Sequence, residues 1–260
     1  MIDFYKYQGT GNDFILIDNR SQIFTGNKIN LAKRWCDRRF GIGSDGLIFI
    51  ENSTESDFVM DFYNPDGSQS FCGNGSRCAV HFAKFLGIIK SGSTSFTAID
   101  GIHTAIITDD TVRIKMNDVA VVEEIGDDYY INTGSPHYIS FENSVLRNII
   151  EVGKAIRYSD KYKPAGTNVN LVEEVNKDHI RIRTYERGVE DETFSCGTGA
   201  TACGLSFAYK NKLAEGFVLV EVKGGQLKIE FKKNNKGFTD IWLEGPAQQV
   251  FKGSFNDNLN

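Results

Sequence analysis

Two stretches of this chain share the pattern Cys-Gly-x-Gly, and they are the strongest indication of its fold. Residues 71–83 read Phe-Cys-Gly-Asn-Gly-Ser-Arg-Cys-Ala-Val-His-Phe-Ala, and residues 195–208 read Ser-Cys-Gly-Thr-Gly-Ala-Thr-Ala-Cys-Gly-Leu-Ser-Phe-Ala. Each stretch follows an extended run, and apolar residues recur at helical spacing after each first cysteine. Gly87 is expected to end the first helix. The two stretches lie about half of the chain apart and therefore predict an internal duplication.

Strand-like runs surround both stretches. They are rich in β-branched and aromatic residues, and several alternate with a period of two. These runs lie at 14–17, 46–50, 58–63, 105–107, 112–116, 129–131, 179–185, 217–222 and 227–231. Residues 223–226, Lys-Gly-Gly-Gln, have the composition of a hairpin turn. Helices are fewer, so the predicted fold class is α+β with sheet predominating.

The composition narrows the classes of function. The chain has 260 residues, 40% of them hydrophobic, and a formal net charge of −5. This is typical of a soluble globular protein, and no apolar run is long enough to span a membrane. The N-terminal residues lack the order of a secretory signal, and a negative net charge disfavours nucleic acid as a partner. The expected partner is a small molecule or another protein.

The five cysteines are expected to be free thiols in a reducing cytoplasm. Their number is odd, and no Cys-x2-Cys or His-x3-His pair occurs, so neither a disulfide framework nor a metal site is predicted. Cys36, Cys78 and Cys203 have the sequence context of core residues. Cys72 and Cys196 differ, because each precedes a glycine pattern at the start of a predicted helix.

A thiol at a helix N-terminus is suited to acid–base chemistry. The unpaired N–H groups and the positive end of the helix dipole lower the pKa of such a thiol. The same N–H groups can bind a carboxylate, and the neighbouring glycines allow it to approach the backbone. If the two halves pack as pseudo-twofold mates, Cys72 and Cys196 would face one carbon. One sulfur would remove a proton and the other would deliver one to the opposite face, which inverts a stereocentre.

The chain resembles the diaminopimelate epimerases, within the wider group that contains the proline racemases, and the resemblance runs nearly end to end. The motifs that carry it are Gly11–Phe14, Gly41–Gly46, Asn64–Ser68, Phe71–Gly75, Gly134–His137, Thr167–Asn170, Tyr185–Gly188 and Cys196–Gly199.

The resemblance implies two pseudo-symmetric lobes, each a β-barrel-like mixed sheet around a central helix, with the active site in the cleft between them. The N-terminal lobe is expected at 1–117, joined by 249–260, and the C-terminal lobe at 118–248. The implied activity is isomerisation without a cofactor or metal, interconverting LL- and meso-2,6-diaminopimelate by a thiolate and a thiol. The implied setting is lysine and peptidoglycan precursor biosynthesis by a cytoplasmic homodimer.

The resemblance also implies roles for individual residues. Cys72 and Cys196 would be the catalytic acid–base pair, and His137 and Glu186 would tune the pKa values of these thiols. The residues implied to bind substrate are Gly73, Asn74, Gly197 and Thr198 at the reacting carboxylate, and Asn12, Asn64, Asn168, Glu186 and Arg187 around the rest of the molecule. A planar bidentate cation such as Arg187 suits a distal carboxylate.

Two positions depart from the family pattern. Ser135 stands where the family usually has Asn, which is expected to weaken a distal contact or leave it to water. Gly46 stands where some members have Gln, so any contact from that side chain is lost.

Two alternatives remain open from the sequence. A proline racemase or hydroxyproline epimerase would use the same thiol pair, but it would leave Arg187 and the asparagines unexplained. A thiol redox or metal-binding protein would use Cys72 and Cys196 differently, but it usually shows closer Cys-x-x-Cys spacing.

Overall fold

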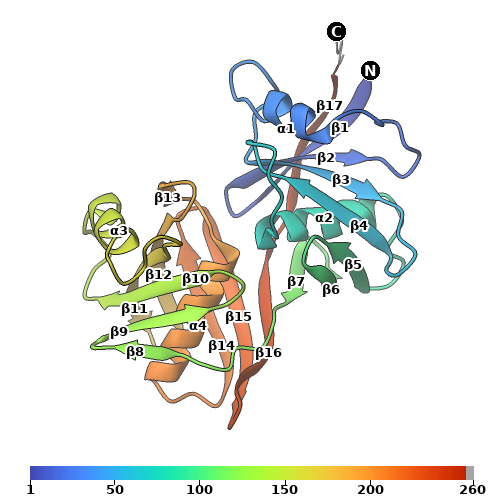
Figure 1. Ribbon diagram of the computed structural model, residues 1–260. Coiled ribbons are helices and arrows are strands. Elements are labelled where there is room, and N and C mark those ends of the chain that lie inside the picture. The colour runs from blue at the N-terminus through green and yellow to red at the C-terminus, as the bar shows by residue number, and fades with distance from the viewer. Residues whose placement is uncertain (256–260) are drawn as a thin grey trace. The chain divides into compact units, whose positions relative to one another are not determined.

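The computed structural model describes residues 1–255, and within them the chain folds into two compact units. Unit 1 comprises Met1–Ile114 and the segment that begins at Gly245, and unit 2 comprises Lys115–Glu244. Each unit is a mixed sheet with helices (Figure 1). No helix among residues 1–255 has the length and apolar content needed to cross a bilayer.

Unit 1 is built on one curved sheet. Its elements are β1 (Ile2–Gly9), β2 (Asn12–Asp18), α1 (Lys28–Trp35), β3 (Gly46–Glu51), β4 (Phe58–Tyr63), α2 (Gly73–Phe85), β5 (Ser93–Ala98), β6 (Gly101–Thr108), β7 (Thr111–Lys115) and β17 (Gln248–Phe255). The strands pair in the order β17-β1-β2-β3-β4-β5-β6-β7. The β2–β3 and β4–β5 pairs are parallel, and the other pairs are antiparallel.

Unit 2 repeats this arrangement. Its elements are β8 (Glu123–Ile125), β9 (Asp128–Asn132), β10 (Pro136–Glu142), α3 (Ile149–Arg157), β11 (Asn168–Asn176), β12 (His179–Glu186), β13 (Asp191–Thr193), α4 (Gly197–Lys210), β14 (Glu215–Val222), β15 (Gly225–Asn234) and β16 (Gly237–Pro246). The strands pair in the order β8-β9-β10-β11-β12-β14-β15-β16. Here β10–β11 and β12–β14 are the parallel pairs.

The strand orders confirm the predicted internal duplication. Strands β9, β10, β11, β12, β14, β15 and β16 reproduce β1 to β7 in sequence order and in parallel or antiparallel sense. Helices α1 and α3 occupy the same place in the two repeats, as do α2 and α4. The α+β class with sheet predominating is therefore confirmed, and so is the duplicated pattern of a mixed sheet around a helix.

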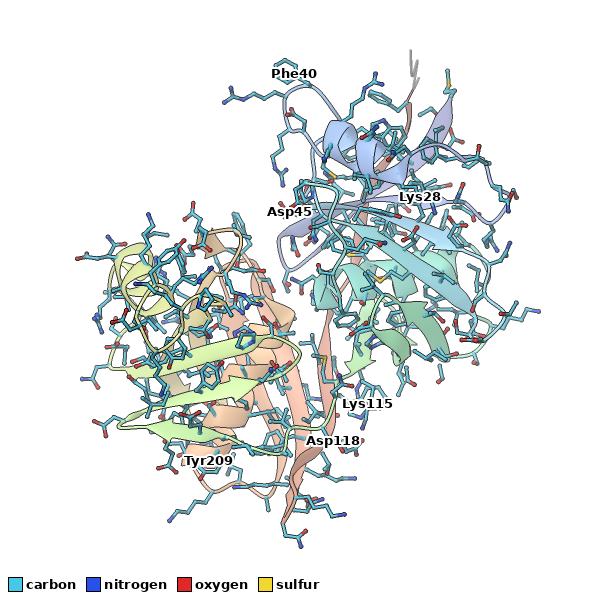
Figure 2. All side chains as sticks on the ribbon, viewed as in Figure 1. Lys28, Phe40, Asp45, Lys115, Asp118 and Tyr209 are labelled. Carbon is cyan, nitrogen blue, oxygen red and sulfur yellow. The ribbon has the colours of Figure 1, made fainter. Side chains whose placement is uncertain are left out.

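A central helix fills each sheet. Helix α2 contacts β1, β2, β3, β4, β6 and β17, and α4 contacts β9, β10, β11, β12, β14 and β15. Nearly every residue of these two helices is buried up to the last turn, whereas α1 buries only Leu31, Ala32 and Trp35. Phe40, beyond the end of α1, is 86% exposed and reaches into solvent (Figure 2). Both central helices begin directly after the predicted cysteines, Cys72 and Cys196.

Candidate active site

Cys72 is the N-cap of α2. Its backbone is extended, and its Sγ accepts a hydrogen bond from the amide of Gly75 at 3.4 Å. A thiol in this position satisfies one of the amide groups that a helix start leaves unpaired. The residue is half-buried, in contrast to the other four cysteines, which are buried.

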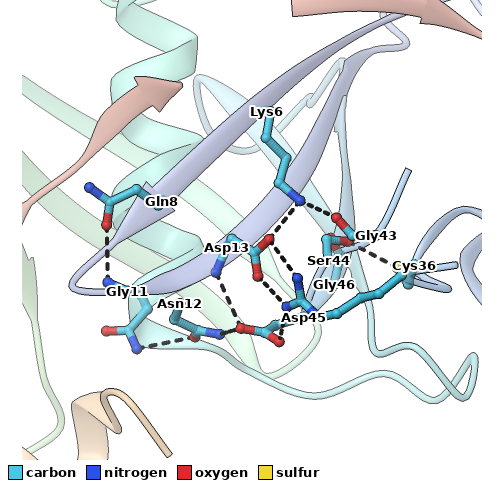
Figure 3. A network of polar contacts seen from close by, with 12 residues as sticks. Lys6, Gln8, Gly11, Asn12, Asp13, Cys36, Gly43, Ser44, Asp45 and Gly46 are labelled. Carbon is cyan, nitrogen blue, oxygen red and sulfur yellow. Dashed lines mark hydrogen bonds and ion pairs between the residues drawn. The ribbon is translucent and has the colours of Figure 1, made fainter. Parts of the chain in front are cut away.

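Two asparagines surround this thiol. The Oδ1 of Asn12, at the start of β2, accepts from Asn74 Nδ2 at 3.2 Å and from the Cys72 thiol at 3.9 Å. Asn12 Nδ2 donates to a carboxylate oxygen of Asp45 at 2.6 Å (Figure 3). Since a carboxylate only accepts, this contact fixes the amide of Asn12 with its oxygen toward Cys72. The structure thus brings together three residues with predicted roles, Cys72, Asn12 and Asn74, and adds Asp45.

Asp45 belongs to a charged network beneath the β1–β2 hairpin (Figure 3). Arg38 contacts Asp45 at 2.8 Å and Asp13 at 2.6 Å, and Lys6 contacts Asp13 at 2.6 Å. Burial alone would raise the pKa of Asp13, but the hydrogen bonds and charges of Arg38 and Lys6 outweigh it and lower that pKa. Asp13 therefore stays ionised, and its contacts with Arg38 and Lys6 hold the start of β2 in place. Sequence reasoning assigned it no role, although Asp45 lies in the Gly41–Gly46 motif.

Asn64 lies in the loop that leads from β4 to Cys72. Its Nδ2 donates to the carbonyl and hydroxyl of Ser68 and to the hydroxyl of Ser70, all between 3.1 and 3.2 Å. These contacts give Asn64 a turn-forming role, one of the ordinary roles of asparagine. Its contact with substrate stays a prediction.

Cys196 is the N-cap of α4, and its side chain makes no capping bond to the helix amides. It is 9% exposed. Its Sγ lies 3.4 Å from the hydroxyl of Thr198, which in turn lies 3.0 Å from Nε2 of His137. The Thr198 carbonyl accepts from the Thr133 hydroxyl at 2.8 Å. The two duplicated thiols thus have different neighbours.

His137, near the start of β10, is completely buried. Burial lowers the pKa of its imidazole to about 3, and the charge of Arg187 acts in the same direction. His137 is therefore neutral at physiological pH. Its Nδ1 faces the amide of Asn170 at 3.2 Å, a residue that the sequence analysis left without a role although it ends the Thr167–Asn170 motif.

Asn168, at the start of β11, connects two other predicted residues. Its Nδ2 donates to the Ser135 hydroxyl at 2.8 Å and to the Pro136 carbonyl at 2.9 Å, and its Oδ1 accepts from the Arg187 amide at 2.9 Å. The Ser135 hydroxyl, expected to weaken a distal contact, thus makes a direct bond within the protein. The guanidinium of Arg187 donates to the carbonyls of Ala165 and Gly166 at 3.2 and 3.4 Å.

Glu186 ends β12, opposite Asp191 of β13. Its carbonyl accepts from the amide of Glu190 at 2.8 Å, which closes the turn that carries Arg187. The expected roles of Glu186 in substrate binding and in tuning a thiol pKa stay predictions.

The other three cysteines are buried, as predicted. Cys36 is 3% exposed, and Cys78 and Cys203 are fully buried. Burial raises the pKa of Cys36 to about 11 and of Cys78 to about 12, and it raises that of Cys203 as well. These thiols are therefore unreactive at neutral pH. Within residues 1–255, no group of three or more His, Cys, Asp or Glu side chains is arranged to hold a metal ion.

Comparison with known proteins shows the family of the chain and agrees with its fold. A protein from Flavobacterium psychrophilum, "Diaminopimelate epimerase", is 50% identical over 252 residues, covering 95% of this chain and 98% of that protein. A solved phenazine biosynthesis protein of the PhzF family from Bacillus anthracis matches with a TM-score of 0.75 at 15% identity, over 97% of this chain and 98% of that one. A hydroxyproline epimerase from Agrobacterium vitis matches with a TM-score of 0.69 at 13% identity, over 97% and 90%. Both structures support the fold alone. The model of the family "Diaminopimelate epimerase" matches residues 4–122 and 129–250, and the chain belongs to this family.

Proposed function

We propose that this protein is an isomerase that interconverts LL- and meso-2,6-diaminopimelate without a cofactor. The observation that carries the proposal is the duplicated placement of Cys72 and Cys196 as N-caps of two central helices. It is supported by the 50% identity to the Flavobacterium psychrophilum protein over nearly the whole of both chains.

In the proposed reaction the two sulfurs act on opposite faces of one α-carbon. A thiolate at one cysteine takes the α-proton and becomes a thiol, while the thiol at the other cysteine gives its proton to the opposite face and becomes a thiolate. The product has the inverted configuration, and the enzyme has exchanged the roles of its two sulfurs. Amides at the starts of α2 and α4, including those of Gly73, Asn74, Gly197 and Thr198, would bind the substrate carboxylate and the charge that develops on it.

The distal end of diaminopimelate carries a second carboxylate and an ammonium. Arg187 suits the carboxylate, because its described contacts are with backbone carbonyls and leave its charge to be paired by an anion. Asn12, Asn64 and Asn168 offer donors and acceptors, and Glu186 offers a negative charge for the ammonium. His137 is proposed to act on Cys196 through Thr198.

We further propose that the enzyme works as a cytoplasmic homodimer in lysine and peptidoglycan precursor biosynthesis. All five cysteines are free thiols, which is consistent with a reducing compartment. Sedimentation of the purified protein tests the dimer.

Solvent-deuterium incorporation tests the reaction. The protein in D₂O is expected to exchange the α-proton of LL-diaminopimelate and to form the meso isomer, and to leave L-proline unchanged. Cys72→Ala and Cys196→Ala should each stop formation of the meso isomer, whereas the matched control Cys203→Ala, which removes a buried thiol, should retain it. Exchange of proline, or turnover by either single N-cap variant close to that of the wild type, would contradict the proposal.

A further inference from the structure

The orientation of the Asn170 side chain is fixed by its neighbours. Asn170 lies on β11 and is completely buried. Its Nδ2 donates to the backbone carbonyl of Tyr138 at 3.0 Å, and its Oδ1 accepts from the Thr184 hydroxyl at 2.9 Å. A carbonyl can only accept, so the nitrogen of the amide must face Tyr138. The amide cannot be flipped without bringing two acceptors together.

This orientation determines the proton position on His137. The second hydrogen of Asn170 Nδ2 points at His137 Nδ1, 3.2 Å away, so Nδ1 is an acceptor and carries no proton. Because the ring is neutral, its proton is on Nε2. That N–H then donates to the Thr198 hydroxyl at 3.0 Å.

The donor-to-acceptor direction of these hydrogen bonds continues to the sulfur of Cys196. Once the Thr198 oxygen accepts from His137, its own hydrogen is available to Cys196 Sγ at 3.4 Å. A hydroxyl that donates to sulfur stabilises the thiolate over the thiol. Gly199 allows this close packing, because a Cβ there would lie 3.0 Å from Asn170 Oδ1 and 3.2 Å from His137 Cε1.

We propose that Asn170 is a positioning residue that holds His137 as its Nε2–H tautomer and thereby directs the Thr198 hydroxyl toward Cys196 Sγ. The relay Asn170–His137–Thr198–Cys196 prepares Cys196 to be the thiolate in the unliganded enzyme. The catalytic meaning of this thiolate rests on the proposed function, but the tautomer and the hydrogen-bond direction do not.

The duplicated half of the chain lacks this relay and supplies an internal reference. Asn74 stands in place of Thr198 in the repeated motif, and the neighbouring Asn12 presents an oxygen that accepts from the Cys72 thiol. The groups at Cys72 therefore include an acceptor where Cys196 has a donor. Changes at Asn170 should leave the reactivity of Cys72 unaltered.

Other charged or titratable groups also act on the relay. Arg187 lowers the pKa of His137, and Cys203 interacts electrostatically with Cys196. Both are retained in every variant below, so differences between variants report on the relay.

The first test is the ¹⁵N NMR spectrum of His137 in the unliganded, otherwise native protein. We expect an unprotonated Nδ1 and a protonated Nε2 between about pH 6 and pH 9, well above the pKa of this ring. A protonated Nδ1 would overturn the proposal, and this result needs no variant to fold.

The second test follows alkylation of each cysteine by peptide mass spectrometry. In Asn170→Asp the carboxylate cannot donate, so the proton moves to Nδ1 and the Thr198 hydroxyl turns toward Nε2. At a pH where NMR shows the ring to be neutral, alkylation of Cys196 should be about tenfold slower, and that of Cys72 should change less than about twofold.

Two controls separate the relay from a structural effect. Thr184→Val removes one neighbour of Asn170 but keeps its bond to Tyr138, so Cys196 should react at the wild-type rate. Thr198→Val should slow Cys196 about tenfold, and Thr198→Ser should restore it. Equal slowing in Thr184→Val and Asn170→Asp would refute the relay. If these results hold but no diaminopimelate is turned over, the proposed function fails and the relay stands.

Discussion

Gly46 and the ring of Phe62 occupy adjoining space so closely that no side chain fits at position 46. A Cβ at Gly46 would lie 2.3 Å from Cε2 of Phe62 and 2.9 Å from its Cζ. Phe62, on β4, is only 5% exposed and packs against Phe14, so it cannot swing freely. Gly46 and Phe62 therefore form one packing arrangement.

This arrangement predicts that Gly46→Ala lowers the free energy of unfolding by about 1–3 kcal/mol, because the added methyl group overpacks a buried site. The loss of unfolding free energy in the double variant Gly46→Ala/Phe62→Leu should be smaller than the sum of the two single losses, by about 1 kcal/mol. The reason is that leucine at position 62 has no ring to clash with the added methyl group. Urea unfolding of the four proteins measures this coupling.

Gly92→Ala is the matched control for that experiment. A Cβ at Gly92 would meet only the Ile107 carbonyl, at 3.4 Å, and a change within about 0.5 kcal/mol is expected. If the losses of unfolding free energy in the two single variants simply add in the double variant, the contact between positions 46 and 62 does not limit the size of residue 46.

A second prediction separates folding from chemistry at Cys72. Serine is among the preferred N-cap residues, and Cys72 already accepts a bond from Gly75, so Cys72→Ser should unfold at the same or higher urea concentration. A hydroxyl is a far weaker acid than a thiol, and epimerisation should fall by at least about a hundredfold. Cys78→Ala should show the opposite pattern, with a loss of stability and little loss of turnover. A destabilised Cys72→Ser would contradict the capping role.

The helix starts could be predicted from sequence because their signals are local. The pattern after Cys72 predicts a helix that ends before Gly87, and α2 runs Gly73–Phe85 with Gly87 at a φ of 74°. The hairpin expected at 223–226 is confirmed between β14 and β15. Apolar spacing, glycine conformation and the order of the duplicated motifs are all readable over a few residues.

The contacts that orient the candidate site could not be predicted in this way. Asp45 meets Asn12, and Asn170 meets His137, only because strands β2 with β3 and β10 with β11 pair in parallel at one particular register. A shift of one residue would turn these side chains to the other face of the sheet. A single sequence contains the motifs but does not reveal the pairing register of the strands. Asp45 and Asn170 could therefore be recognised only as motif members, and their contacts could not be predicted.

A third prediction concerns acid stability and His137. The folded-state pKa of about 3 lies below the ordinary value near 6.5, so between these pH values the unfolded chain binds a proton that the folded protein refuses. Its contribution to stability is complete above about pH 6.5 and is lost as the pH falls toward 3. His137→Gln should therefore reduce the slope of unfolding free energy against pH by up to about 1.4 kcal/mol per pH unit in this window.

Urea unfolding at several pH values between about 4 and 7 measures that slope for both proteins. If the plots of unfolding free energy against pH are parallel for the wild type and His137→Gln, then His137 is not held neutral in the folded state.

The last prediction concerns the distal specificity of Arg187. Its described contacts are with the carbonyls of Ala165 and Gly166 and, through its amide, with Asn168, so the guanidinium can pair with a substrate carboxylate. Removing a charge-assisted bidentate bond costs about 1.5–3 kcal/mol, so Arg187→Gln should lower kcat/KM for diaminopimelate roughly 10- to 150-fold. Lysine lacks the distal carboxylate, so the rate of α-proton exchange with lysine should be unchanged by this substitution. Arg181→Gln, which removes an arginine already paired with Glu173 and Glu221, should alter neither rate. A loss of equal size for both substrates would place Arg187 at the reacting carboxylate instead of the distal one.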